Sequence, residues 1–168
     1  DRPFLDWQRG AMAALRARDK AALVEAVRRS CADKARVVAA DEREQDSRAL
    51  LNFGHTFGHA IETATGYTGL LHGEAVAIGM VMASEMSARL GWIPRADVAA
   101  VRELLQAAGL PVEAPAGLDV EEFLALMAVD KKVAAGKLRL VLLRPLGEAV
   151  VTADFPFEVL AGVVSDFV

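Results

Sequence analysis

The chain has 168 residues, a formal net charge of −4 and a single cysteine, Cys31. A chain of this length fits one domain with a real core, because it can bury roughly 68–70% of its unfolded surface. Its 54% hydrophobic and 25% charged residues exclude a disordered chain, and its acidity gives no support to a nucleic-acid or membrane partner. The lone cysteine cannot form an internal disulfide and suits a reducing compartment, so we expect a cytoplasmic protein.

Apolar residues recur every three or four positions along most of the chain, which predicts helices. We expect them near residues 4–16, 20–40, 47–65, 72–90, 95–108 and 119–130. Asp46 or Ser47 is a candidate cap for the third helix, and Asp119 for the sixth. Glycine or proline marks several of the helix ends: Gly66, Gly91, Pro94, Gly109 and Pro111. The sequence begins at Asp1, close to the first predicted helix, so we expect it to be part of a longer chain.

The spacing of the apolar residues changes near the C-terminus. Residues 138–143 form a short apolar run, residues 144–148 a turn and residues 149–152 a second strand, and residues 157–167 return to a helical pattern. We therefore expect a mainly α fold, a single helical domain over 1–168 with a small β-hairpin. The chain has no βαβ alternation, GxGxxG or Walker loop, so any nucleotide site must be supplied elsewhere. No apolar run approaches the ~20 residues of a membrane span.

Cys31 lies in an amphipathic stretch, residues 22–40. A small side chain in such a stretch is usually buried, and we expect Cys31 to be a packed apolar residue rather than a nucleophile.

The chain's three histidines all lie between positions 55 and 72. Arg48, Asn52, His55 and His59 follow one another at steps of four, three and four, so on one helix they would share roughly 60° of one face. A solvated polar stripe is the alternative, but such a stripe more often carries Lys and Glu.

Gly54 and Gly58 are costly in a helix interior, at about 1 kcal/mol each relative to alanine. Close approach of a backbone or a ligand would offset that cost. We therefore expect this helix to be tightly packed or to lie against a ligand.

A histidine pair at i and i+4, such as His55 and His59, is a common metal geometry, and His72 is the candidate for a third ligand. Two imidazoles and a carboxylate with open positions would make a catalytic site. The carboxylate candidates are Glu62 and Glu74. We favour the interpretation of Glu62 as a charge on the helix surface, and Glu74 can equally cap its helix.

Two further features suit an anionic, oxygenated substrate. Lys34 precedes the histidine block, and Lys131 and Lys132 follow the sixth predicted helix. Arginine grips a carboxylate with two hydrogen bonds, while lysine serves phosphate as a point charge. Taken alone, each of these lysines is a surface charge.

Together these residues resemble a known family. Residues 48–62 (RALLNFGHTFGHAIE) and 72–80 (HGEAVAIGM) closely resemble the C-terminal domain of 3-dehydroquinate synthase. Flanking segments resemble further landmarks of that family: residues 34–44, 109–111, 130–133 and 139–143. The resemblance covers nearly the whole chain.

The resemblance implies an enzyme of the shikimate route to aromatic amino acids. The family uses NAD and a divalent metal, usually zinc and otherwise cobalt, to convert the phosphorylated keto sugar acid DAHP into 3-dehydroquinate and phosphate. A ring hydroxyl is oxidised, phosphate is eliminated, the ketone is reduced back, and the ring opens and recloses. NAD is returned unchanged.

By matching positions, the resemblance implies that His55 and His72 are zinc ligands. It implies that His59 contacts the substrate and can move protons, and that Lys34 and Arg48 bind the substrate's carboxylate and hydroxyls. The remaining implied contacts, to phosphate or substrate, are Asn52 and one of Lys131 and Lys132.

The chain also departs from the family pattern. The family's third zinc ligand is a glutamate in a segment that precedes the region where this chain begins, so neither Glu62 nor Glu74 takes that role by resemblance. The NAD-binding N-terminal domain is absent too, and no NAD-binding residue is identified here. Asp46 replaces a frequent glycine, a mild change in a turn. We expect the chain alone to be inactive and to bind zinc weakly, and the complete protein to be a homodimer.

Two other classes of protein stay open. Other sugar phosphate cyclases, which form 2-deoxy-scyllo-inosose or valiolone, share the fold and the histidine pattern but act on substrates without a carboxylate. Lys34 and Arg48 favour a carboxylate. A non-catalytic helical interaction module that keeps a fossil site is the remaining alternative, and a polyol dehydrogenase is disfavoured by the NFGHTFGH block.

Overall fold

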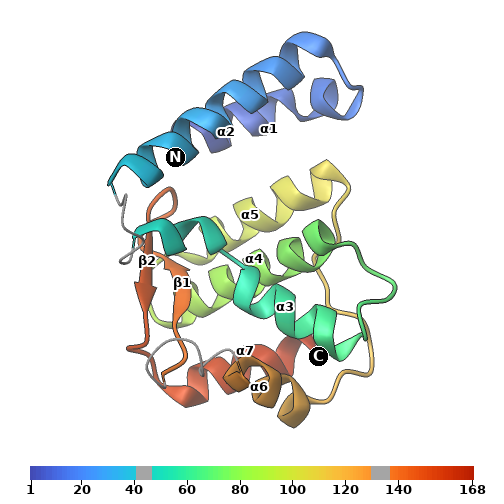
Figure 1. Cartoon of the computed structure of the whole chain (residues 1–168), viewed down its shortest axis with the longest axis vertical. Coiled ribbons are helices and arrows are strands. Elements are labelled where there is room, and N and C mark those ends of the chain that lie inside the picture. Colours follow the sequence, from blue (N-terminus) through green and yellow to red (C-terminus); the bar gives the residue numbers. More distant parts are fainter. Residues whose placement is uncertain (41–46, 130–136) are drawn as a thin grey trace.

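The computed structural model describes residues 1–40, 47–129 and 137–168, and shows a helical protein with one β-hairpin (Figure 1). The predicted mainly α fold is confirmed. No helix among the described residues is long and apolar enough to cross a membrane. The elements are α1 (Arg2–Arg16), α2 (Lys20–Ala40), the 3-10 helix η1 (Ser47–Asn52), α3 (His55–Ala64), α4 (His72–Arg89), α5 (Arg95–Ala108), α6 (Val120–Val129), β1 (Leu140–Leu143), β2 (Ala149–Thr152) and α7 (Phe157–Phe167).

The helix ends follow the predicted signals. The Asp119 carboxylate accepts a hydrogen bond from the Glu122 backbone N–H at 2.8 Å, which caps α6. Pro94 directly precedes α5, and Gly109 ends it with a φ of 83°, a conformation that glycine adopts without a Cβ penalty. Asp46, the other predicted cap, lies outside the described residues.

The hairpin packs on the helices through β1. Strands β1 and β2 pair antiparallel, with Leu140 opposite Thr152 and Leu143 opposite Ala149. All residues of β1 are buried, and the Leu143 backbone N–H donates to the Ser87 hydroxyl of α4 at 2.9 Å. The continuous apolar run in the sequence is therefore a strand covered by the core.

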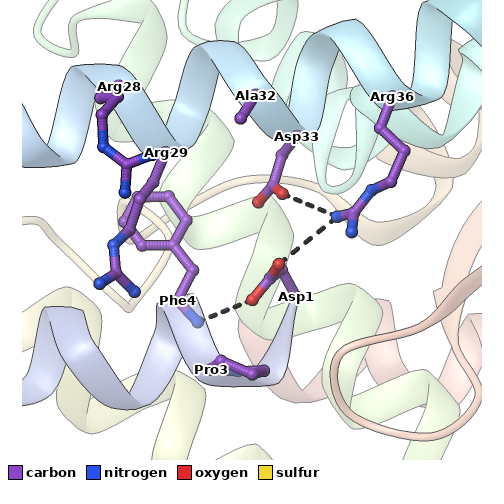
Figure 2. Close-up of a pocket in the computed structure, with 8 residues that line it drawn as sticks. All are labelled: Asp1, Pro3, Phe4, Arg28, Arg29, Ala32, Asp33 and Arg36. Atoms are coloured by element: carbon purple, nitrogen blue, oxygen red, sulfur yellow. Dashed lines mark hydrogen bonds and ion pairs between the residues drawn. The ribbon is translucent and has the colours of Figure 1, made fainter.

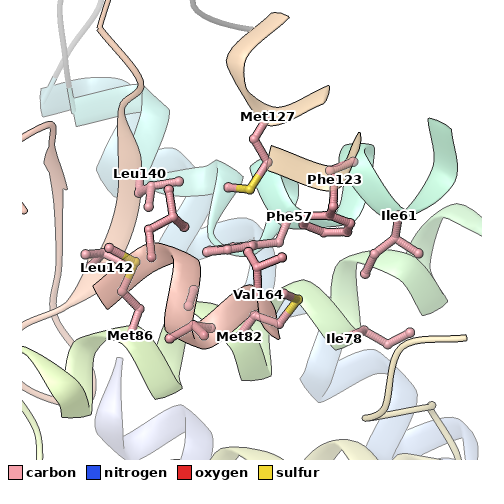
Figure 3. Packing of buried hydrophobic residues seen from close by; sticks show 14 of the residues in the cluster. Phe57, Ile61, Ile78, Met82, Met86, Phe123, Met127, Leu140, Leu142 and Val164 are labelled. Atoms are coloured by element: carbon pink, nitrogen blue, oxygen red, sulfur yellow. The ribbon is translucent and has the colours of Figure 1, made fainter. Parts of the chain in front are cut away.

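The core lies around α4, which contacts α3, α5, β1 and α7. Figure 3 shows Phe57 of α3 between side chains of α4, α6 and α7. Burying one such side chain contributes about 1.5–3 kcal/mol. This packing holds α3 against α4 and so fixes the histidines that both helices carry. The labelled core residues are Phe57, Ile61, Ile78, Met82, Met86, Phe123, Met127, Leu140, Leu142 and Val164.

Helices α1 and α2 form a hairpin at one end of the molecule, where α1 contacts α5 and α2 contacts η1 (Figure 1). Neither helix contains a buried residue. Cys31 of α2 is exposed, so the prediction that it is buried is wrong. Only α1 and η1 pack substantially against α2 among the described elements, so much of its surface stays uncovered.

A cleft of about 360 Å³ lies between α1 and α2. Figure 2 shows Arg36 of α2 between Asp33 and Asp1, with nitrogen–oxygen distances of 2.7 and 3.4 Å. Farther along the helix, hydrogen bonds from Arg28, and then Arg29, lower the pKa of the Glu25 carboxyl to about 2. The arginines of this cleft are thus paired within the hairpin, and the pair between Arg36 and Asp1 joins α2 to the start of α1.

Candidate metal and substrate site

The predicted helix over residues 47–65 is interrupted. Residues 47–52 form the 3-10 helix η1, and α3 begins at His55. Gly54 between them has a φ of 83°, which ends one helix and starts the next in a new direction. The prediction of one shared helix face is therefore wrong: Arg48 and Asn52 lie on η1, while His55 and His59 lie on α3.

Tight packing of α3 on α4 accounts for the glycines. A Cβ atom placed on Gly79 of α4 would lie 2.1 Å from the carbonyl oxygen of Gly54, and one on Gly58 would lie 3.1 Å from the Cα of Val76. The predicted close backbone approach is confirmed for both glycines, but only Gly58 lies in a helix interior, because Gly54 precedes α3 with a left-handed φ. Gly79, the third member of the contact, was not identified from the sequence.

This packing brings the three histidine rings together. His55 and His59 occupy the first two turns of α3, and His72 is the first residue of α4. The ring centroids are 5.7 Å apart for His55 and His59, 5.4 Å for His55 and His72, and 5.8 Å for His59 and His72. His72 therefore lies beside the histidine pair, as a shared site of the three imidazoles requires.

Hydrogen bonds distinguish the three rings. His72 Nδ1 lies 3.1 Å from both carboxylate oxygens of Glu62, and His55 Nδ1 lies 3.4 Å from the carbonyl oxygen of Phe53. A carboxylate or a carbonyl oxygen only accepts, so Nδ1 carries the proton in both rings, and in a neutral imidazole Nε2 then keeps a free lone pair. Within the described part of the chain, no group hydrogen-bonds to the ring of His59.

Glu62 is not the surface charge that the sequence suggested. It is only 9% exposed, because α3 turns it toward the start of α4 rather than toward solvent. The alternative for Glu74 is confirmed: its carboxylate accepts from the Leu71 backbone N–H at 2.7 Å and caps α4. The spacing of three residues from His59 to Glu62 was the signal available in the sequence, since it places both on one side of a helix.

The donor atoms fit a divalent transition metal. His59, Glu62 and His72 each offer a ligand atom, and these atoms lie within 4.8 Å of one another. Imidazole nitrogens with a carboxylate oxygen suit zinc and cobalt. His55 lies next to this group, with its ring 5.4 Å from that of His72. The assignment of His55 and His72 as the ligands stays a prediction.

The other predicted site residues lie on two neighbouring elements. Lys34 is an exposed residue of α2, and α2 contacts η1, which carries the exposed Arg48 and Asn52. Arg48 and Asn52 thus lie in the segment that leads into α3, and Lys34 lies on the helix that contacts this segment. Lys131 and Lys132 lie outside the described residues.

Comparison with known proteins identifies relatives of this chain. Residues 1–133 match the family model described as 3-dehydroquinate synthase C-terminal. The chain is 65% identical over 160 residues to the 3-dehydroquinate synthase of Azotobacter vinelandii, and 59% identical over 165 residues to that of Pseudomonas putida. These alignments cover 95% and 98% of the chain but only 44% and 45% of the relatives, so the chain spans less than half of their length.

Solved structures of two sugar phosphate cyclases share the fold. One is a 2-epi-5-epi-valiolone synthase from Streptomyces hygroscopicus with NAD+ and Zn2+ bound, which has a TM-score of 0.86 and 26% sequence identity. The match covers 99% of this chain and 46% of the synthase chain. The other is a 2-deoxy-scyllo-inosose synthase complexed with carbaglucose-6-phosphate, NAD+ and Co2+, which has a TM-score of 0.65 and 28% sequence identity. The match covers 74% of this chain and 36% of the synthase chain.

Proposed function

This chain belongs to the 3-dehydroquinate synthase C-terminal family, and we propose that it is the metal- and substrate-binding half of an enzyme that converts DAHP to 3-dehydroquinate and phosphate. The observation that carries the proposal is the meeting of His55, His59 and His72 where α3 packs on α4. Three imidazoles from two helices, one of them bonded to a buried carboxylate, are not needed for packing. They form a site for chemistry.

His55 and His72 hold the metal in this proposal. Each ring donates its Nδ1–H to a fixed oxygen and so presents Nε2, which is how metal-ligating histidines are usually held. Zinc or cobalt, when bound, supplies a Lewis acid that lowers the pKa of the substrate hydroxyl to be oxidised. A third ligand comes from the N-terminal half of the complete enzyme, as the family pattern implies.

His59 serves the substrate rather than the metal. Its ring is exposed, and among the described residues it has no hydrogen-bond partner that would fix one tautomer. An imidazole can take up or release a proton near neutral pH, so His59 can move protons to and from the substrate.

In this proposal, cationic and amide side chains bind the substrate. We assign Lys34 and Arg48 to the carboxylate and hydroxyls, because a guanidinium matches a carboxylate with two parallel hydrogen bonds. We assign Asn52 and one of the lysines at positions 131 and 132 to the phosphate. Arg48 and Asn52 are joined to the histidines by only a few residues of chain, so these assignments place both parts of the substrate beside the metal.

The remaining parts of the proposal concern the complete protein. NAD+ is bound mainly by the N-terminal domain, which the relatives' greater length accommodates. The complete enzyme works as a cytoplasmic homodimer in the shikimate pathway, and residues 1–168 form one domain of it. The chain alone is inactive, since it supplies neither the NAD site nor the third metal ligand.

The test is release of phosphate from DAHP, with NAD+ and Zn2+, by this chain mixed with a separately expressed N-terminal half. The matched control is the same mixture with His55→Ala. We expect release only when both halves and His55 are present. Release by the chain alone at enzymatic rates would contradict the proposal, and so would release that survives His55→Ala.

A second candidate function rests on the fold match to the valiolone synthase. Its substrate class differs by lacking the carboxylate that we assign to Lys34 and Arg48. Assaying DAHP beside a sugar phosphate without a carboxylate separates the two functions, and we expect turnover of DAHP only.

A further inference from the structure

Glu62 is the hydrogen-bond partner of His72. His72 Nδ1 is 3.1 Å from each oxygen of the Glu62 carboxylate, so one N–H is shared between two acceptors. A hydrogen bond to a charged acceptor is roughly twice as strong as a neutral one. This contact therefore fixes both the tautomer of His72 and the orientation of its ring.

The two side chains of this hydrogen bond differ in their exposure to solvent. The Glu62 side chain is 11% exposed, whereas the His72 side chain is 56% exposed. The carboxylate thus lies toward the protein interior, on the inner side of the His72 ring, and the exposed part of the ring is its outer side. A catalytic metal keeps positions open for substrate, which the exposed outer side allows.

Helix α3 provides the support for this contact. Glu62 sits in the last turns of α3, next to the fully buried Ile61, and His72 begins α4 after the connecting loop. The hydrogen bond therefore joins the end of one helix to the start of the next, over a separation of ten residues. The orientation of the His72 ring is therefore fixed by the packed helix α3, through Glu62, rather than by the loop that precedes His72.

Direct metal ligation by Glu62 is the alternative, since its oxygens lie within 4.8 Å of ligand atoms of His59 and His72. In that arrangement Nδ1 of His72 would lose its proton to bind the metal beside the carboxylate. The metal would then lie between two groups on the inner side of the ring. A carboxylate buried to this degree leaves little room there for the substrate hydroxyl.

We propose that Glu62 is a positioning residue that holds His72 through Nδ1–H, so that Nε2 points to the metal, and that Glu62 does not ligate the metal itself. This inference rests on the proposed function, because it takes His72 as a ligand. Removal of such an outer partner typically costs about 10- to 100-fold in metal affinity.

Two variants of Glu62 test the role, and one residue elsewhere supplies a control. Glu62→Gln keeps an oxygen that can accept from Nδ1–H, while Glu62→Ala removes it. The control is Glu85→Gln on α4, because the Glu85 side chain is similarly buried, at 13% exposed, but pairs with Arg89 and Arg95 instead of a histidine. It reports what loss of a buried carboxylate charge does on its own.

The first readout is the tautomer of His72, measured by long-range ¹H–¹⁵N NMR on the metal-free chain at a pH where its imidazole is neutral. We expect the proton on Nδ1 in the unmodified chain, in Glu62→Gln and in Glu85→Gln, and a shift toward Nε2–H in Glu62→Ala. A proton on Nε2 in the unmodified chain would overturn the proposal. An unchanged tautomer in Glu62→Ala would also overturn it.

The second readout is the zinc dissociation constant of the chain assembled with the N-terminal half, from competition with a chelator. We expect about a 10- to 100-fold rise for Glu62→Ala, a smaller rise for Glu62→Gln and little change for Glu85→Gln. If Glu62→Gln weakens zinc binding as much as His72→Ala does, Glu62 is a ligand and the proposal fails. Neither readout uses DAHP, so missing turnover with these shifts intact would refute the proposed function alone.

Discussion

Gly79 is the position where one added methyl group should disturb the site most directly. Alanine there would place Cβ 2.1 Å from the carbonyl oxygen of Gly54, where ordinary contacts lie at 3.4 Å or more. The two backbones must therefore separate by about 1.3 Å, because neither atom belongs to a flexible side chain. His55 directly follows Gly54, so the ring of His55 moves relative to that of His72.

The expected effect of Gly79→Ala has two parts. Overpacking costs about 1–3 kcal/mol, and the severity of the contact places this variant near the upper limit. Alanine regains about 1 kcal/mol of helix propensity, which leaves about 2 kcal/mol of net destabilisation. Metal–ligand distances tolerate only about 0.2 Å, so zinc affinity should fall well beyond what the stability loss explains.

Urea unfolding of the chain and zinc titration of the assembled halves measure the two parts. Gly10→Ala is the matched control, because Gly10 also lies inside a helix but a Cβ there meets nothing within 4 Å. We expect the control to be neutral or more stable by up to about 1 kcal/mol. If Gly79→Ala matches the unmodified chain in both stability and zinc affinity, the argument from helix packing is refuted.

Three further predictions concern stability, each measured by urea unfolding. Burial raises the pKa of Glu85, but hydrogen bonds from Arg95 and Arg89 outweigh burial and hold the pKa below its ordinary 4.5. The ion pair therefore stabilises the fold above that value, and this contribution is lost as the pH falls below it. The difference in free energy of unfolding between the unmodified chain and Glu85→Gln should thus shrink on acidification, and a difference that stays constant would contradict this. Phe57→Ala should cost about 3–5 kcal/mol, because the ring is 1% exposed at the centre of the core, and a cost under 1 kcal/mol would refute that placement. Asp119→Ala should cost about 1 kcal/mol through loss of the α6 cap, whereas Asp119→Asn should cost only a few tenths; equal losses would contradict a capping role.

The helices and the hairpin could be predicted from the spacing of apolar residues alone, but the break at Gly54 could not. Residues 47–65 keep a helical pattern of apolar residues across the break. Gly54 has a φ of 83° and lies against Gly79, which is distant in sequence. Local patterns carry no information about such a contact.

Burial was the other limit of sequence reasoning. The pattern around Cys31 shows which side of α2 is apolar, but not whether another element covers that side, and here Cys31 stays exposed. Glu62 shows the opposite error: a glutamate near the end of a helix is usually exposed, yet the return of the chain at His72 covers it. The histidines themselves were predictable, because close spacing of rare residue types survives any detail of packing.

The most direct test of the central claim is the zinc content of the assembled two halves after removal of free metal, compared across three histidine variants. We predict that His55→Ala and His72→Ala lose the bound zinc, while His59→Ala keeps it and loses turnover of DAHP. Zinc retained in both His55→Ala and His72→Ala would contradict the account. Zinc lost in His59→Ala but retained in His55→Ala would replace the assigned ligands with His59, Glu62 and His72.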